Sequence, residues 1–243
     1  MPGAGREGKL IFLFLGTGRG SRQEHHGTKE GVDGCLTVGR IASMKEERRK
    51  VACIGDSITY GYQIRDRSQT YPGILQGLLG EGCSVRNFGN SGRGILRKAR
   101  KLDEPRAFMF MPQHRQALEW KPDVVICNLG INDLIDWDQL GHEFIADYRA
   151  LLAEYRALAG IPRMLIWHRL APLFPGHPFH GDERVEAVNG RIAEVARLEA
   201  VETIEMEDPL RGHREWFPDK LHPNEAGAAE IARVTAEYLQ RGD

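Results

Sequence analysis

The sequence has no marked excess of charge of either sign. Its 33 lysines and arginines and 34 aspartates and glutamates leave a formal net charge of −1 over 243 residues. Because the two signs are interspersed, the chain offers no basic surface that would release counterions from a nucleic acid or hold an acidic membrane. It also lacks an apolar run near the ~20 residues that a membrane-spanning helix requires. We therefore expect neither a nucleic acid nor a membrane as a partner.

Cysteine is scarce, and the motifs that hold metals and cofactors are missing. The four cysteines are Cys35, Cys53, Cys83 and Cys127. None forms a C-x-x-C pair, and Cys53 and Cys127 lie in apolar runs typical of buried strands, which predicts free thiols. A bridge between these two would need neighbouring strands with suitable Cα and Cβ distances. There is no H-E-x-x-H cluster, and Gly16-x-Gly18-x-Gly20 lacks the spacing of a dinucleotide turn, so we expect no metal and no cofactor.

The first 43 residues differ in composition from the rest of the chain. They are rich in glycine and show little amphipathic periodicity, whereas a charged run from Met44 leads directly into an apolar strand pattern. We predict that translation starts at Met44 and that residues 1–43 are either upstream sequence or a disordered arm. The apolar run over residues 10–15 is too short for a signal peptide and is not followed by a small-residue cleavage site, which favours a cytoplasmic location.

Residues 44–243 alternate between strand patterns and helix patterns. Short apolar runs predict strands over residues 51–54, 84–88, 124–128, 164–167 and 202–204. Apolar residues at helical spacing predict helices over 144–155 and 185–195, and a last helix begins after Asn224, a residue type that caps helices. Regular alternation predicts one domain with a three-layer α/β/α architecture, in which helices cover both faces of a parallel sheet of about five strands.

Three polar motifs follow the first three predicted strands. They are Gly55-Asp56-Ser57, Gly89-Asn90-Ser91-Gly92 and Gly130-Ile131-Asn132-Asp133. Open α/β sheets bind their ligands at the carboxyl ends of the strands. We therefore expect the three motifs to meet at one site.

Ser57 lies where a strand turns into a helix. A serine there is commonly a simple helix cap. The same position also directs its hydroxyl into the crevice, beside backbone N–H groups of the first helical turn that can hold an oxyanion. Ser57 alone does not separate the two interpretations.

Asp219 and His222 lie three residues apart in the loop before the last helix. Taken alone, they could be a surface ion pair. One turn of chain can also hold them side by side, so that the carboxylate accepts the Nδ1 proton and Nε2 faces a serine, as general-base catalysis requires. His222 must then be neutral, and activity is expected to fall in acid.

The serine turn, the Gly-x-Asn-Asp motif and the Asp-x-x-His pair, in this order, resemble the SGNH or GDSL hydrolase family. The resemblance implies a flavodoxin-like fold and ester hydrolysis through an acyl-enzyme intermediate. It implies Ser57 as nucleophile and His222 as base, oriented by Asp219. It further implies an oxyanion hole formed by the backbone N–H groups of Ser57 and Gly89 and the side-chain amide of Asn132.

Two longer motifs suggest the substrate. R-N-F-G-x-S-G after the second strand and H-x-E-W-F-P-D-x-x-H-P-N near the end resemble bacterial carbohydrate O-acetylesterases, including sialate-type enzymes, and predict acetylated sugars as substrates. Aromatic rings and an arginine that could contact a sugar are Tyr60, Arg93, Trp137, Phe179 and Trp216. The alternative for each of them is packing within its loop.

Two other functions compete with this prediction. We expect the proline-rich segment 169–180 to overhang the site, and its apolar residues could accept an acyl chain instead of a sugar, as in a lysophospholipase or thioesterase. The alternative from another class is a non-catalytic carbohydrate-binding protein that retains the fold.

Overall fold

The computed structural model describes residues 48–241, so the predicted start at Met44, the first 43 residues and Cys35 lie outside the described part. All five predicted strands are present and form one parallel sheet. They are β1 (Arg49–Gly55), β2 (Cys83–Gly89), β5 (Val124–Asn128), β6 (Arg163–Trp167) and β7 (Glu202–Ile204).

The sheet order confirms the predicted topology. The strands lie in the order β2-β1-β5-β6-β7, which is 2-1-3-4-5 when the sheet strands are counted along the chain. This is the flavodoxin-like order. The chain places β2 on one side of β1 and then β5, β6 and β7 on the other side, so the switch point of the sheet lies between β1 and β5. These two neighbouring strands precede Ser57 and Asn132. An additional antiparallel hairpin, β3 (Arg100–Lys101) and β4 (Glu104–Pro105), was not expected from the sequence.

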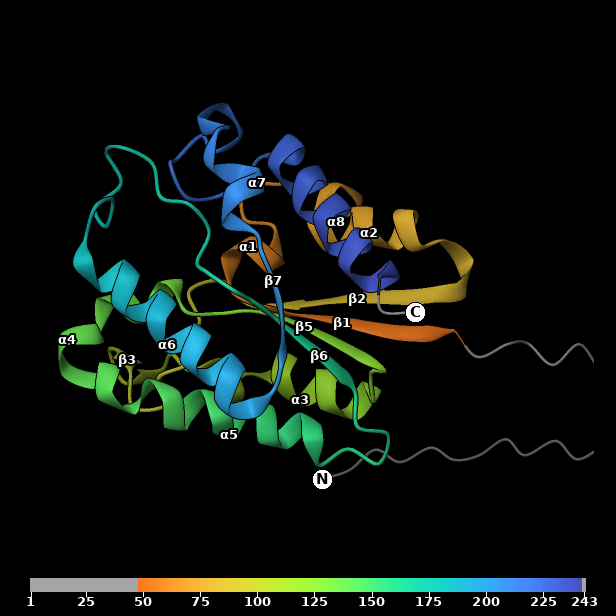
Figure 1. Ribbon diagram of the computed structural model, residues 1–243, viewed down its shortest axis with the longest axis horizontal. Coiled ribbons are helices and arrows are strands. Elements are labelled where there is room, and N and C mark those ends of the chain that lie inside the picture. Colours follow the sequence, from red (N-terminus) through yellow and green to blue (C-terminus); the bar gives the residue numbers. More distant parts are fainter. Residues whose placement is uncertain (1–47, 242–243) are drawn as a thin grey trace, which may run out of the picture. The chain divides into compact units, whose positions relative to one another are not determined.

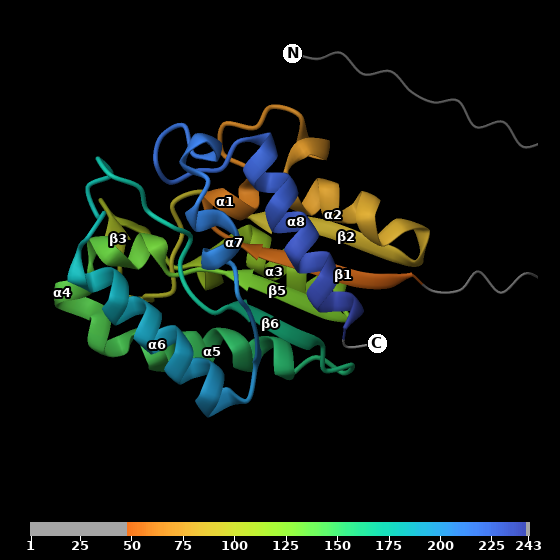
Figure 2. The same cartoon turned by 45° about the horizontal axis from the view of Figure 1, so that its top comes forward.

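Helices cover both faces of the sheet (Figures 1 and 2). On one face lie α2 (Tyr71–Leu79), α7 (Glu207–Arg211) and α8 (Glu225–Gln240). On the other lie α3 (Pro112–Trp120), α5 (Phe144–Arg156) and α6 (Glu183–Glu199). The short helices are α1 (Ser57–Tyr60) and α4 (Trp137–Leu140), and the 3₁₀ turns are η1 (Arg67–Gln69), η2 (Gly80–Gly82), η3 (Phe108–Phe110), η4 (Ile131–Ile135), η5 (Gly141–Glu143) and η6 (Arg214–Trp216). The predicted three-layer architecture is confirmed.

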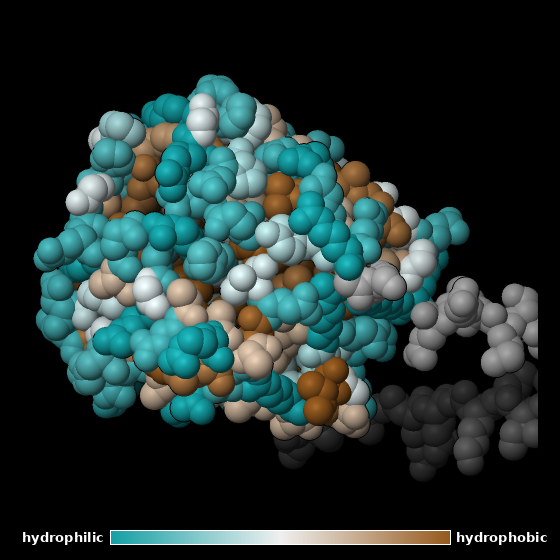
Figure 3. All heavy atoms as spheres, viewed as in Figure 1, coloured by the Kyte–Doolittle hydropathy of each residue, from teal (hydrophilic) through white to brown (hydrophobic). Residues whose placement is uncertain are grey.

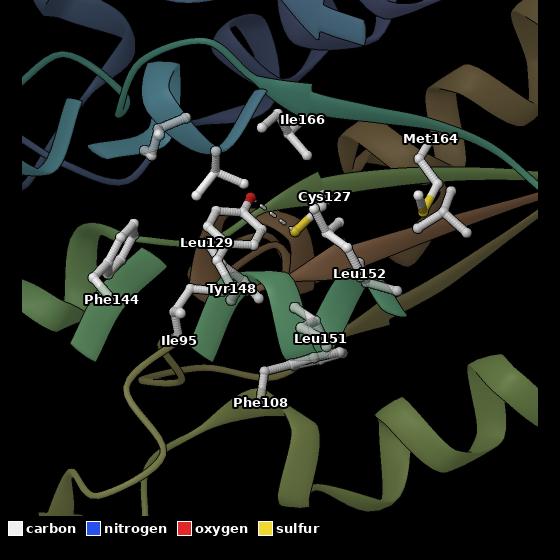
Figure 4. Packing of buried hydrophobic residues seen from close by; sticks show 14 of the residues in the cluster. Ile95, Phe108, Cys127, Leu129, Phe144, Tyr148, Leu151, Leu152, Met164 and Ile166 are labelled. Carbon is white, nitrogen blue, oxygen red and sulfur yellow. Dashed lines mark hydrogen bonds between the residues drawn. The ribbon is translucent and has the colours of Figure 1, made fainter. Parts of the chain in front are cut away.

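Alternation along the strands divides the core into two layers. Ala52 and Ile54 of β1 face α3, α5 and α6, whereas Val51 and Cys53 face α2 and α8. Cys127 belongs to the first layer, where its thiol meets the Tyr148 hydroxyl at 3.3 Å (Figure 4). Cys53 and Cys127 therefore lie on opposite faces of the sheet, which excludes a bridge between them.

The three described cysteines are free thiols, as predicted. Burial raises the pKa of Cys53 and of Cys127 to about 12. The hydrogen bonds that these thiols make lower the pKa, but by less than burial raises it. These two thiols therefore stay protonated and unreactive at neutral pH.

The predicted helix signals hold as well. The Asn224 side chain accepts the N–H groups of Ala226 and Gly227 at 3.1 Å each, which caps α8 as the sequence predicts.

No helix between residues 48 and 241 is both long enough and apolar enough to cross a membrane. The face drawn in Figure 3 is mostly hydrophilic, with apolar residues in small scattered groups, which is ordinary for a protein surface.

Candidate active site

The turn after β1 holds Ser57 at the carboxyl edge of the sheet. The Asp56 side chain accepts the Ile58 N–H at 2.9 Å and caps α1, and Gly61, at φ 83°, ends the helix after one turn. Gly55 must be a glycine because a Cβ there would lie 2.6 Å from the Asn128 carbonyl oxygen. Ser57 is only 7% exposed, so its hydroxyl is positioned by the fold and largely shielded from bulk water.

Ser57, His222 and Asp219 form a continuous chain of hydrogen bonds. Ser57 Oγ lies 2.8 Å from His222 Nε2, and His222 Nδ1 lies 2.6 Å from Asp219 Oδ2. The other carboxylate oxygen, Asp219 Oδ1, accepts the backbone N–H groups of His222 at 2.7 Å and Leu221 at 3.1 Å. This geometry allows the imidazole to take the serine proton while the carboxylate fixes its orientation.

Asp219 is held in its ionised form. Partial burial raises the pKa of its carboxyl, but hydrogen bonds from the His222 backbone and side chain and from the Leu221 backbone outweigh burial, and the pKa lies below its ordinary value. The ionised carboxylate can therefore accept the Nδ1 proton and stabilise the imidazolium that forms when His222 takes a proton.

Tyr62 and Gln63, which follow α1, contact His222 and Asp219. These contacts were not expected from the sequence. The Gln63 side-chain amide donates to Asp219 Oδ2 at 2.9 Å, and the Tyr62 ring lies 4.6 Å from the His222 ring, measured between centroids. Gln63 has a φ of 71°, a left-handed backbone that is uncommon for a residue other than glycine. No motif marks either residue, because their partners lie more than 150 positions away in the chain.

Two of the expected oxyanion donors have hydrogens available. The Ser57 N–H, in the first turn of α1, has no acceptor among residues 48–241. The Asn132 side chain, on η4, donates one amide hydrogen to the Arg93 carbonyl at 3.0 Å, which leaves its second hydrogen for a substrate. Both groups suit the role that the sequence predicts for them.

Gly89, the third expected donor, is occupied elsewhere. Its N–H donates to Asn87 Oδ1 at 2.8 Å, and a Cβ there would lie 2.2 Å from the Tyr60 nitrogen, so this glycine allows β2 to pack against α1. Gly92, three residues later, has a φ of 75° and lines the same pocket as Asn132, and its N–H has no acceptor in the described part of the chain. Of the two glycines, Gly92 is therefore better placed to donate its N–H to an oxyanion.

Buried carboxylates fix the loop that carries Gly92. Asp133 Oδ1 and Oδ2 both accept the Ile95 N–H at 2.9 Å, and Oδ1 also accepts the Leu96 N–H at 2.8 Å. Asp147 of α5 accepts the Arg97 N–H at 2.8 Å. Burial raises the pKa of Asp133 to about 6, although these backbone hydrogen bonds act against it. Asp133 in the Gly-x-Asn-Asp motif thus supports the neighbouring loop.

Two of the hollows at this edge of the sheet share Ser91. The larger, about 750 Å³, is lined by Gly92, Asn132 and the β3-β4 hairpin, and the smaller, about 380 Å³, by Tyr60, Tyr62 and neighbours from β2 and α3. Ser91 lines both, so the two meet beside the site. The larger volume lies in the range of small-molecule sites. In the described range, no group of three or more His, Cys, Asp or Glu residues could hold a metal ion.

The residues expected to contact a sugar fall into two groups. Tyr60 lines the smaller hollow and is 45% exposed, and Arg93 lines the larger. The remaining three line neither hollow. Trp216 stacks on His213 with ring centroids 3.6 Å apart, Trp137 packs edge-on against a core phenylalanine, and Phe179 packs against the core. Trp216 also packs against the core on the other face of the sheet, so for all three residues the structure favours the alternative of packing.

Segment 169–180 lies against the loop that carries the Asp219-His222 pair. The Phe174 N–H donates to the Lys220 carbonyl at 3.2 Å, and Lys220 Nζ donates to the Gly176 carbonyl at 3.2 Å. Most of its apolar side chains turn inward, because Leu170, Ala171 and Phe174 are buried in the core, and Pro175 and Pro178 are its exposed apolar residues. The segment therefore supplies little apolar surface for an acyl chain.

A flavodoxin-like sheet with a serine hydrogen-bonded to an Asp-x-x-His pair at its carboxyl edge is the arrangement of the SGNH hydrolases. Comparison with known proteins agrees with this class. Residues 53–230 match the GDSL-like lipase/acylhydrolase family, and the chain belongs to this family.

Relatives give more detail. An acetylxylan esterase from Xylanibacter ruminicola is 32% identical over 221 residues, covering 82% of this chain but 45% of that protein, so the chain spans less than half of its relative. Among solved structures, a carbohydrate acetylesterase from Sinorhizobium meliloti has a TM-score of 0.63 at 18% identity, covering 81% of this chain and 100% of its own. An aryl esterase of M. smegmatis has a TM-score of 0.63 at 19% identity, covering 79% and 99%. At these identities the structural likeness concerns the fold.

Proposed function

We propose that this protein is a serine esterase that removes acetyl groups from O-acetylated carbohydrates through an acyl-enzyme intermediate. The observation that carries the proposal is the unbroken hydrogen-bond chain from Ser57 through His222 to Asp219. Family membership supports ester hydrolysis, and the likeness to an acetylxylan esterase supports the acetyl group and the sugar.

The first half of the reaction forms the acyl-enzyme. Ser57 Oγ attacks the acetyl carbonyl carbon while His222 Nε2 takes the hydroxyl proton, and the imidazolium is stabilised by the Asp219 carboxylate. The tetrahedral intermediate then collapses. The bond to the sugar oxygen breaks, His222 gives its proton to that oxygen, and the deacetylated sugar leaves.

The second half repeats these steps with water. His222 takes a proton from a water molecule, whose oxygen attacks the acetyl carbon on Ser57. When this intermediate collapses, the bond to Ser57 Oγ breaks and His222 returns the proton to the serine. The products are acetate and the free enzyme, and no cofactor takes part.

The oxyanion of both intermediates is stabilised by three donors in this proposal. They are the Ser57 N–H, the Asn132 amide and the Gly92 N–H, with Gly92 in place of Gly89 because the Gly89 N–H already bonds to Asn87. An amide adds no charge that would bind the ground state equally well. Each such donor typically contributes about 10²- to 10³-fold to kcat.

An acyl-length series tests the proposal. The same alcohol esterified with acetyl, butyryl and octanoyl groups should be hydrolysed with kcat/KM highest for acetyl, because Leu170, Ala171 and Phe174 of segment 169–180 are buried in the core and leave little apolar surface for a longer chain. Highest kcat/KM for octanoyl would favour a lysophospholipase or thioesterase. Acetylated sugars that bind without releasing acetate would favour a carbohydrate-binding protein.

A further inference from the structure

The β3-β4 hairpin forms one wall of the larger hollow, and Gly92 and Asn132 lie on another. The hairpin is tied to the site loop by backbone hydrogen bonds. The Gly94 N–H donates to the Arg106 carbonyl at 3.1 Å, and the Arg106 N–H donates to the Ala99 carbonyl at 3.0 Å. A substrate whose ester carbonyl lies at Asn132 and Gly92 therefore has the hairpin as its next surface.

Cations dominate the lining of this hollow. Its charged residues are Arg93, Arg100, Lys101, Glu104, Arg106 and Asp136. Arg106, which is 8% exposed, pairs with Asp136 at 3.0 Å, so these two charges neutralise each other. Three cations then face a single carboxylate, Glu104. The chain as a whole has a net charge of −1, so this local excess of positive charge does not follow from its composition.

The three remaining cations have no carboxylate partner within residues 48–241. The Arg93 guanidinium donates to the Pro105 carbonyl at 3.0 Å and to Asn90 Oδ1 at 3.3 Å, both uncharged acceptors. Arg100 likewise donates to two backbone carbonyls, and Lys101 makes no ion pair. Because Arg93 is held in place and partly buried, its charge is screened less than that of a free surface side chain.

We propose that this hollow binds the carboxylate of an anionic sugar, so that the enzyme prefers acetylated carbohydrates that carry an acidic sugar unit. This inference rests on the proposed function and specifies its substrate class. An acetyl group is far smaller than about 750 Å³, so the hollow suits the sugar side of the ester. A guanidinium offers paired N–H donors that match a carboxylate, and Arg93 lies in the loop whose carbonyl positions Asn132.

The test compares two substrates that differ only in charge. One is an acetylated methyl uronoside, and the other is the same compound with its carboxylate converted to an uncharged amide. The measured quantity is the ratio of kcat/KM for acetate release, acid over amide. We expect a ratio of about tenfold at low ionic strength, which falls several-fold as salt rises because the attraction is electrostatic.

Two double variants show whether the hairpin causes the preference. Arg100→Gln with Lys101→Gln should lower the ratio several-fold, because Arg93 is then the one unpaired cation left in the lining of the hollow. The matched control is Lys121→Gln with Arg197→Gln. It also removes two positive charges, but from exposed positions outside the hollow, and should leave the ratio unchanged. The salt dependence of the unmodified protein tests the inference even if the hairpin variant folds poorly.

The outcomes separate the two proposals. Acetate release from both compounds with a ratio near one at every salt concentration would overturn the anionic subsite and leave the proposed esterase intact. An equal loss of preference in both double variants would also overturn it. If neither acetylated sugar releases acetate, the proposed function fails, and the inference fails with it.

Discussion

The two sides of the site are built in different ways. On the base side, Asp219 and His222 are three residues apart and bond to each other through both side chain and backbone. On the oxyanion side, the loop after β2 is held by Asp133, 37 to 38 residues away, and by Asp147, 50 residues away. The base side thus depends on local spacing, and the oxyanion side on distant carboxylates. A local motif can be recognised in a sequence, whereas a distant anchor becomes visible only in the fold.

The largest expected effect lies on the base side. His222→Gln removes the group that accepts the Ser57 proton but keeps a side chain of similar size. We expect kcat to fall by about 10⁴-fold or more, since the residues of such a chain act as a unit. His213→Gln is the control and should keep kcat nearly unchanged, because His213 stacks on Trp216 and hydrogen-bonds to Glu215. A His222→Gln enzyme within tenfold of the unmodified protein would remove His222 from the mechanism.

The oxyanion side should respond less. Asn132→Ala deletes one of three donors, and we expect kcat to fall by roughly 10²- to 10³-fold with little change in KM, because the lost bond strengthens in the transition state. Gln139→Ala, at an exposed position on α4, serves as control. Loss confined to KM would show that Asn132 binds substrate and does not stabilise the oxyanion.

Asp56 and Asp133 are both buried carboxylates beside the site, and they should affect stability differently. Burial raises the pKa of Asp56, which caps α1, to about 7, and its second oxygen has no hydrogen-bond partner. Between pH 3.8, the ordinary pKa of an aspartate, and about pH 7, the Asp56 carboxyl therefore keeps its proton in the folded state and has lost it in the unfolded state. Stability should fall as pH rises from about 4 to 7, because the unfolded state binds fewer protons in this range.

Asp56→Asn removes the titrating carboxyl group, and the asparagine side-chain oxygen can still accept the Ile58 N–H. Between pH 5 and pH 8, the unmodified protein should lose about 2 kcal/mol of unfolding free energy relative to this variant, measured by urea unfolding. Asp133→Asn should behave differently, because Asp133 accepts two backbone N–H groups that hold the Gly92 loop, and its replacement should lower stability at both pH values. Parallel pH profiles for the unmodified protein and Asp56→Asn would contradict the raised pKa.

The smallest effect should come from Gln63, which supports the base side from outside the motif. Gln63→Ala removes one exposed hydrogen bond to Asp219, and we expect kcat to fall by roughly two- to tenfold. Gln63→Glu should reduce kcat further, since it places a second negative charge beside the Asp219 carboxylate. Gln69→Ala, at an exposed position on η1, is the matched control. Equal rates for all three variants would leave Gln63 without a role in positioning Asp219.

The contrast between the two sides explains what the sequence could predict. The parallel sheet and the caps followed from apolar periodicity and from residue types at helix ends, which act locally. The flavodoxin-like order of the strands followed from the family resemblance. Ser57, Asp219 and His222 followed from family motifs. The choice between Gly89 and Gly92 did not, because the motif contains both glycines and only the Asn87 hydrogen bond and the packing on Tyr60 distinguish them.

The substrate contacts were the hardest to predict. Trp137 and Phe179 have side chains that suit sugar binding, yet in the fold both pack against the core. The β3-β4 hairpin has strands of two residues each, too short to show a periodic pattern, so the cationic hollow that it borders was not visible in the sequence. Residue type alone does not reveal whether a side chain faces a pocket or the core.

The central claim is that Ser57 is the nucleophile, and labelling with a fluorophosphonate followed by peptide mass mapping tests it most directly. The label should attach to Ser57 in the folded protein, and Ser57→Ala should lose both labelling and acetyl ester hydrolysis, whereas Ser68→Ala, at an exposed position on η1, should retain both. Labelling of another residue, or undiminished hydrolysis by purified Ser57→Ala protein, would contradict the account.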